Sequence, residues 1–352
     1  MHMSASDIAV VFRCDVSPQI GMGHVVRCMT LATALRDRGV AVRFVMAGLR
    51  SEATDFEVDS PPLHQSEGEF LPLEDAGALI AAVRRNGGSA VLIDHYRADE
   101  RYLSALQEAG LRIAIIDDIG DRSLLAADWL LNHNVGADSL GYRVRRDCEV
   151  LLGPRYAPLR PQFRKARGRL NRSFAAEDCR VLITLGGGDV ARLLARTLRA
   201  LCKCPFRLDV RCLAGAGFAD DHLQRVAAES PHRVELFGTA LDVAGHMTWA
   251  DLSINAGGMT CWELSCLGVP ILVMTLSLDQ RANADRLTAA GVARSLPSPD
   301  SEQFDSVLAA TTFDLLRSPG ERRRMSELGR HLVDGNGAER SAESFIRFVQ
   351  KQ

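Results

Sequence analysis

One histidine stands where a strand is expected to end and a helix to begin, directly after two closely spaced glycines, Gly21-Met-Gly23-His24. Glycines at such a turn let the backbone approach a ligand closely. In the first turn of a helix the positive end of the helix dipole disfavours an imidazolium, so His24 is expected to be neutral and able to accept a proton. The pattern predicts a general base. A histidine that only packs or caps the turn fits this short motif equally well.

A second glycine-rich turn follows an expected strand in the second half of the chain, Thr184-Leu-Gly186-Gly187-Gly188-Asp189. Consecutive glycines between a strand and a helix allow backbone N–H groups to face an anion. The spacing is not that of a P-loop, which excludes a P-loop NTPase at this position, and it lacks the dinucleotide-binding fingerprint. A tight turn without a ligand is the alternative.

The third glycine-rich element is the most informative, Asn255-Ala-Gly257-Gly258-Met259-Thr260-Cys-Trp-Glu263. A helix that begins at such a turn can hold a diphosphate through its N–H groups and dipole. Glu263, one turn into that helix, can accept hydrogen bonds from two vicinal ribose hydroxyls, because a carboxylate suits two donors. The alternative is a solvated surface charge. Asp279 and Gln280 begin the next helix and are expected to face the same crevice.

Short β-branched runs alternate with helix-length periodic segments through most of the chain, which is typical of βαβ units. The fold class is therefore α/β, with parallel sheets covered on both faces. We expect strands at 8–13, 41–46, 90–93 and 112–116, then at 180–185, 207–213, 234–237, 252–254 and 270–274. The first helix is expected over 24–38.

A proline-rich stretch at 152–161 and a basic run at 164–172 separate the two series and predict a domain boundary. We place the domains at 1–165 and 166–352 and expect the helical tail, 338–351, to fold back onto the first. The basic run lacks interleaved aromatic residues, so a solvated linker is favoured over a nucleic-acid or membrane patch.

Composition limits the function classes. With 42 Lys plus Arg against 44 Asp plus Glu, the net charge of −2 disfavours a generic nucleic-acid partner. No apolar run is long enough to span a bilayer and 8–12 is too short for a signal peptide, so a cytoplasmic protein without stable membrane insertion is expected. The nine cysteines are odd in number and form no C-x-x-C pair, which favours reduced thiols over a zinc site.

These stretches resemble a known group of enzymes. The third element resembles the nucleotide site of GT-B nucleotide-sugar enzymes of the lipid II N-acetylglucosaminyltransferase type. The whole chain is similar to the UDP-sugar hydrolases of pseudaminic acid biosynthesis. The matching stretches cover both domains in order: 12–28, 93–96 (Ile-Asp-His-Tyr), 116–118, 130–134, 152–163 and 257–263.

The resemblance implies a GT-B fold, with two Rossmann-like domains facing a cleft. It implies an inverting hydrolysis, independent of metals and cofactors, that removes UDP from UDP-2,4-diacetamido-2,4,6-trideoxy-β-L-altropyranose. His24 matches the catalytic histidine, Tyr96 a sugar-site tyrosine and Glu263 the nucleotide-binding glutamate, whereas Asp279 stands where the family has asparagine. By the same resemblance, His24 and Tyr96 are expected to be the catalytic residues. The residues expected at the substrate are Asp15, Gly21, Gly23, Arg160, Gly186, Gly187, Gly257, Gly258, Met259, Thr260, Glu263, Asp279 and Gln280.

Two other functions stay open. A GT-B glycosyltransferase would use the same UDP site and the same histidine to activate a sugar hydroxyl in place of water. A non-catalytic subunit would bind the nucleotide sugar without turning it over. The paired acids Asp117-Asp118 and the run Asn132-His133-Asn134 follow expected strands or apolar runs and are placed near the substrate. The oligomeric state is not encoded in any pattern.

Overall fold

The computed structural model describes residues 9–15, 23–47, 68–70, 75–121, 123–170, 172–175, 177, 179–186, 190–238, 242–276 and 278–350. The chain divides into two compact units: unit 1 comprises Met1–Arg160 and Asn336–Gln352, and unit 2 comprises Pro161–Gly335. The sequence places the boundary at 165, whereas the chain passes into unit 2 after Arg160 and its last residues return to unit 1.

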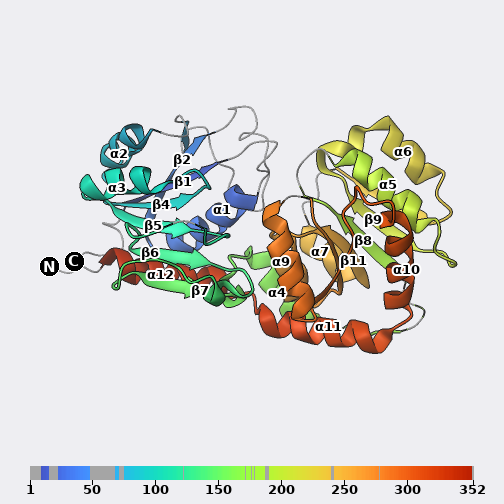
Figure 1. Cartoon of the computed structure of the whole chain (residues 1–352). Helices are drawn as coiled ribbons and strands as arrows, with labels where there is room; N and C mark the ends of the chain where they lie inside the picture. The colour runs from blue at the N-terminus through green and yellow to red at the C-terminus, as the bar shows by residue number, and fades with distance from the viewer. Residues whose placement is uncertain are drawn as a thin grey trace. The chain divides into compact units, whose positions relative to one another are not determined.

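Unit 1 contains a seven-stranded parallel sheet in the order β3-β2-β1-β4-β5-β6-β7 (Figure 1). The order changes direction between β1 and β4, where open α/β sheets bind ligands. The strands are β1 (Ala9–Asp15), β2 (Ala41–Ala47), β3 (Gly68–Phe70), β4 (Ala90–Asp94), β5 (Arg112–Ile116), β6 (Trp129–Asn132) and β7 (Glu149–Leu152). The helices are α1 (Gly23–Arg36), α2 (Ala76–Arg85), α3 (Glu100–Glu108) and α12 (Gly337–Gln350), with short 3-10 helices η2 (Ala137–Ser139) and η3 (Pro154–Tyr156).

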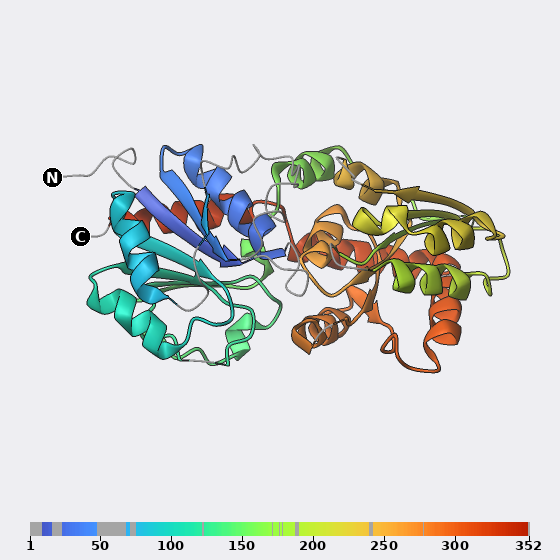
Figure 2. The same ribbon diagram turned by 90° about the horizontal axis from the view of Figure 1, so that it is seen from above.

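The sheet of unit 1 is buried on both faces. Successive residues of a strand point to opposite faces, so a doubly covered strand reads as a continuous apolar run. In β1, Val10 and Phe12 pack in the core that includes α1 and α12, whereas Val11 packs in the core that includes α2 and α3. Figure 2 shows α12 in red and α1 in blue on one side of this sheet.

The C-terminal helix α12 is tied into unit 1 by specific contacts. Trp129 Nε1 donates to Ser344 Oγ at 2.9 Å, and its ring meets Phe345 edge-on at 5.3 Å between centroids. Arg112 on β5 donates to the carbonyl of Phe348 at 2.7 Å. The Arg112 bond satisfies one of the carbonyls that a helix leaves open at its C-terminus.

Unit 2 contains a six-stranded parallel sheet in the order β10-β9-β8-β11-β12-β13, whose direction changes between β8 and β11. The strands are β8 (Arg180–Thr184), β9 (Asp209–Leu213), β10 (Arg233–Phe237), β11 (Leu252–Ala256), β12 (Ile271–Met274) and β13 (Ala293–Ser295). The helices are α4 (Pro161–Arg169), α5 (Ala191–Leu201), α6 (Asp221–Ala228), α7 (Val243–Trp249), α8 (Thr260–Leu267), α9 (Leu278–Ala289), α10 (Phe304–Leu316) and α11 (Pro319–Leu332), with η4 (Gly215–Ala219).

The basic run at 164–172 is not a solvated linker, and that prediction was wrong. Residues 164–169 of the run lie in α4, and Arg167 donates to the carbonyls of Cys266 at 2.8 Å and Arg330 at 2.9 Å. Arg172 donates to the carbonyl of Ala250 at 2.6 Å. These arginines supply donors to carbonyls at or next to helix C-termini, which composition alone does not reveal. None of the described helices has the length and apolar character needed to cross a membrane.

Candidate active site

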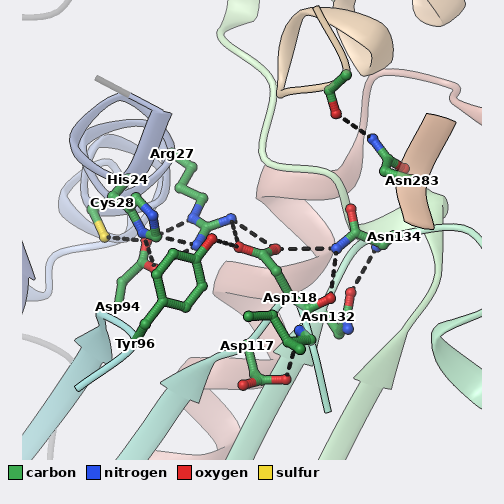
Figure 3. Close-up of polar contacts among 12 residues, drawn as sticks. His24, Arg27, Cys28, Asp94, Tyr96, Asp117, Asp118, Asn132, Asn134 and Asn283 are labelled. Carbon is green, nitrogen blue, oxygen red and sulfur yellow. Dashed lines mark hydrogen bonds and ion pairs between the residues drawn. The ribbon is translucent and has the colours of Figure 1, made fainter. Parts of the chain in front are cut away.

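Polar side chains gather at the carboxyl ends of β4 and β5 in unit 1 (Figure 3). His24 is the second residue of α1, Asp94 is the last residue of β4, and Tyr96 follows two residues later. Asp118 lies two residues beyond β5. Because parallel strands bring their carboxyl ends to one edge, residues far apart in sequence meet here.

His24 and Asp94 form a buried pair, with 2.7 Å between Nδ1 and Oδ1. Burial alone would raise the pKa of Asp94, but Arg27 and His24 hold it well below its usual range. The carboxylate is therefore ionised and can only accept, so the proton of this hydrogen bond is carried by His24 Nδ1. Arg27 Nη2 lies 3.0 Å from Nδ1, and these two donors share the Asp94 acceptor.

Arg27 joins two carboxylates. It lies one turn after His24 on α1, and its Nε donates to Asp94 Oδ2 at 2.6 Å while Nη1 donates to Asp118 Oδ1 at 2.9 Å. Burial opposes the charge of this guanidinium, but Asp118 and Asp94 outweigh it and raise the pKa of Arg27. A planar guanidinium suits such a bridge because its donors point in fixed directions, whereas a lysine ammonium is a point charge.

Asp118 is the second anchored carboxylate. Besides Arg27, it accepts from Asn134 Nδ2 at 3.1 Å and from the Tyr96 hydroxyl at 3.2 Å. Burial raises its pKa, and Arg27 followed by His133 lowers it to a value below the usual one. The Tyr96 ring is 40% exposed and meets the His24 ring edge-on, with 5.0 Å between centroids. The structure thus brings together His24 and Tyr96, the two residues predicted to be catalytic.

The neighbouring acid, Asp117, has a structural role. Its Oδ2 accepts from the Tyr142 hydroxyl at 2.7 Å and from the backbone N–H groups of Ile119 and Gly120 at 3.1 and 2.7 Å. These bonds close the turn after β5 and fix where Asp118 leaves the strand. The two acids predicted to lie near the substrate therefore face different surroundings.

Two buried groups beside this cluster are neutral at physiological pH. Burial lowers the pKa of His133 to about 4, against a smaller raising effect from Asp118. Burial, Cys14 and Asp94 raise the pKa of Cys28, whose thiol donates to Asp94 Oδ2 at 3.3 Å. The thiol is thus a weak hydrogen-bond donor to the carboxylate, not a thiolate.

In unit 2 the third glycine-rich element forms the turn between β11 and α8. A Cβ at Gly257 would lie 3.0 Å from the Gln280 carbonyl oxygen, so glycine lets α9 approach this turn closely. The Asn283 amide donates to the Gly257 carbonyl at 2.7 Å, and Gln280 Oε1 accepts from the backbone N–H of Leu276 at 3.1 Å. Glu263 lies in the first turn of α8 and is buried.

The other predicted site residues are placed as follows. Gly258, Met259 and Thr260 lead into α8 and are partly buried, and Gly186 has φ +97° after β8, a conformation that favours glycine. Gly23 is the first residue of α1, Asp15 is buried and ion-paired with Arg13, and Arg160 is the last residue of unit 1 before α4. Gly21 and Gly187 lie outside the described residues, as does the side chain of Asp279.

Sequence reasoning gave no role to Arg27 or Asp94. A signal for Arg27 was available, because its spacing of three from His24 puts both on one helix face. Asp94 ends an apolar run, the position at which a parallel strand presents a side chain to a ligand. Within the described part of the chain, no three His, Cys, Asp or Glu side chains are grouped to hold a metal ion.

Comparison with known proteins fits this architecture. Residues 181–328 match the model of the glycosyltransferase family 28 C-terminal domain. The UDP-N-acetylglucosamine--N-acetylmuramyl-(pentapeptide) pyrophosphoryl-undecaprenol N-acetylglucosamine transferase of Halorhodospira halophila is 30% identical over 331 residues, covering 87% of this chain and 89% of that protein. The chain belongs to the GT-B family of nucleotide-sugar enzymes that includes this transferase.

One further relative and one solved structure are also similar to this chain. The UDP-2,4-diacetamido-2,4,6-trideoxy-beta-L-altropyranose hydrolase of Campylobacter jejuni is 31% identical over 189 residues, covering 52% of this chain and 62% of that protein. The crystal structure of MurG from Acinetobacter baumannii aligns with a TM-score of 0.70 and 16% identity, covering 97% of this chain and 99% of that one. The GT-B fold expected from the sequence is confirmed.

Proposed function

We propose that this GT-B enzyme is a hydrolase that removes UDP from UDP-2,4-diacetamido-2,4,6-trideoxy-β-L-altropyranose by inverting attack of water at the anomeric carbon. The observation that carries the proposal is the buried His24–Asp94 pair, with 2.7 Å between Nδ1 and Oδ1, at the ligand-binding edge of unit 1. The similarity to the Campylobacter jejuni hydrolase, 31% over 52% of this chain, supports the choice of substrate.

His24 is the base in this mechanism. Its Nε2 takes a proton from water as the water oxygen forms a bond to the anomeric carbon. The anomeric C–O bond breaks, and UDP leaves with the bonding electron pair. Asp94 accepts from Nδ1–H throughout, which orients the ring and stabilises the imidazolium that forms.

Unit 2 supplies the nucleotide site in this proposal. The turn at Gly257 and Gly258 leads into α8, whose N-terminal N–H groups and dipole stabilise the charge of the departing diphosphate. The Glu263 carboxylate accepts from the two ribose hydroxyls. UDP is a good leaving group, so no strong general acid is needed.

Glycosyl transfer is the second candidate. The full-length similarity to the Halorhodospira halophila transferase, 30% over 87% of this chain, favours it. The same His24 would then take its proton from an acceptor hydroxyl, and the product would be a glycoside instead of a free sugar.

Proton NMR of the protein with the UDP-sugar separates these candidates. Hydrolysis predicts release of UDP together with a first-formed free sugar of inverted anomeric configuration. Retention of configuration would contradict inverting attack by water. Free sugar that accumulates only slowly, with a glycoside formed when acceptors are supplied, would identify a transferase. Tight UDP binding without turnover of any UDP-sugar would identify a binding protein and would contradict the proposal.

A further inference from the structure

We propose that Asp118 is a positioning residue that balances the charge of Arg27 and thereby leaves the Asp94 carboxylate available to stabilise the imidazolium of His24. The inference deepens the proposed function and rests on it for the role of His24 as the base. Asp118 acts through Arg27 and not on the reacting atoms.

The guanidinium of Arg27 lies between two carboxylates (Figure 3). Its Nε donates to Asp94 Oδ2 at 2.6 Å, and its Nη1 donates to Asp118 Oδ1 at 2.9 Å. The side chains of Arg27, Asp94 and Asp118 are 5%, 1% and 16% exposed. Because solvent screens buried charges weakly, each of the three acts strongly on its neighbours.

The titratable and charged groups that interact with His24 or with its partners come from several elements. They are Arg27 and Cys28 on α1, Cys14 on β1, Asp94 and Tyr96 at the end of β4, Asp118 beyond β5 and His133 beyond β6. Burial raises the pKa of Cys28 and lowers that of His133 to about 4, so both are neutral at pH 7.

Three of these described groups are ionised at pH 7. The pKa of Arg27 is raised and those of Asp94 and Asp118 are lowered, so one positive and two negative charges surround a neutral His24. Protonation of His24 therefore brings the cluster to electrical balance.

The consequence of losing Asp118 follows from this balance. Arg27 and Asp94 alone would already neutralise each other, and Arg27 Nη2 lies 3.0 Å from His24 Nδ1. The imidazolium would then be an uncompensated positive charge in a buried cluster, which costs free energy. Asp118 is thus expected to make His24 a stronger base, although Arg27 separates the two.

Titration of the histidine signals of the full chain by proton–nitrogen NMR tests the inference without substrate, and His24→Phe identifies the signal of His24. Asp118→Asn keeps the size of the side chain and an oxygen that can accept from Arg27. It should lower the midpoint of the His24 titration by about one pH unit, because an imidazolium loses a nearby negative charge. The kcat for UDP release should fall about threefold, since only part of a tenfold loss of basicity reaches the rate. The Kd for UDP should not change.

A double variant separates charge from shape. Arg27→Gln with Asp118→Asn removes both charges and again leaves one excess negative charge, on Asp94. The His24 midpoint should return to that of the unsubstituted protein or rise above it. An unchanged midpoint in Asp118→Asn, or a double variant as low as Asp118→Asn, would overturn the inference. Should Asp118→Asn fail to fold alone, the double variant carries the test, and a midpoint below that of the unsubstituted protein would overturn it.

Asp117→Asn is the matched control, because it removes the neighbouring carboxylate, whose described bonds go to Tyr142 and to the backbone. It should leave the His24 midpoint unchanged. A shift equal to that of Asp118→Asn would show that the bond to Arg27 is irrelevant, and would contradict the inference. Failure of the proposed hydrolysis is seen separately, as absence of UDP release by the unsubstituted protein, because the NMR titration needs no substrate.

Discussion

The two units present different kinds of chemistry at corresponding edges of their sheets. In unit 1 the edge carries charged side chains, with Arg27 joining Asp94 and Asp118 in a largely buried network. In unit 2 the edge is a backbone turn at Gly257, held by the amide of Asn283. Charged side chains can take part in proton transfer and stabilise the charges that form, whereas the N–H groups at a helix N-terminus bind an anion.

This difference predicts that unit 1 governs catalysis and unit 2 governs nucleotide binding. Substitutions in the unit 1 network should change turnover or the response to pH, and substitutions at the unit 2 turn should change nucleotide affinity. Measurement of turnover, pH response and nucleotide affinity in single variants tests this assignment. A substitution that changed the quantity assigned to the other unit would break the comparison.

The largest effect is expected at His24. Replacing it with phenylalanine removes the base, and a positioned base contributes about 10² to 10⁴ in rate, so kcat should fall at least about a hundredfold. The Kd for UDP should not change. Steady-state UDP release and calorimetry measure the two quantities. Near-normal turnover in His24→Phe would show that another group takes the proton.

The next effect is expected at Glu263. In Glu263→Gln the side chain keeps its size and loses the charge, so two charge-assisted bonds to ribose hydroxyls weaken. The Kd for UDP should rise about thirtyfold, equivalent to about 2 kcal/mol.

The nucleotide 2′,3′-dideoxy UDP provides the control for Glu263. The dideoxy nucleotide lacks both hydroxyls, so Glu263→Gln should bind it as well as the unsubstituted protein does. Equal weakening for UDP and dideoxy UDP would mean that Glu263 supports the helix and does not contact the ribose.

Much of the fold could be predicted because buried parallel strands read as apolar runs. β1, β2, β4 and β5 were expected within two residues of their observed ends. β3, β6, β7 and β13 were not predicted, since each has only three or four residues and at least one of them is polar, whereas the equally short β12 is apolar throughout and was expected. The stretch at 152–161 was used for a domain boundary and for its resemblance, and in the structure Arg340 of α12 donates to the carbonyl of Arg155 within it.

The candidate site was predictable where a local motif marks it. His24 follows a glycine turn, and Tyr96 belongs to a short motif after a strand, so each was identified alone. The partners of these residues come from distant parts of the chain: Arg27 and Asp94 are 67 residues apart, and Arg27 and Asp118 are 91 apart. Which carboxylate the guanidinium reaches is decided by strand order, which local spacing does not contain.

The smallest effect concerns acid stability and separates the two units through His133. Burial lowers its pKa to about 4 in the folded protein, below the ordinary 6.5. Above pH 6.5 the imidazole is neutral in the folded and the unfolded state, so its contribution to stability is fully present there. As the pH falls from 6.5 towards 4, the unfolded chain binds a proton that the folded chain does not, and stability is lost. Between pH 6.5 and 5 this loss is about 1.5 kcal/mol.

Urea unfolding of the protein and of His133→Gln at pH 8, 6.5 and 5 measures this contribution. At pH 8 both side chains are neutral, which gives the cost of the substitution itself. Between pH 6.5 and 5 the variant should lose about 1.5 kcal/mol less stability than the unsubstituted protein. Hydrogen exchange should show this difference in acid-dependent stability in β6 of unit 1 and not in β11 of unit 2.

Asp94 and Asp118 do not contribute to the loss of stability between pH 6.5 and 5. Their pKa values are lowered in the folded protein, so their protonation removes stability only below about pH 3.8. Equal acid sensitivity of the two proteins would show that His133 titrates alike in the folded and unfolded states, and that burial at the unit 1 edge does not hold its imidazole neutral.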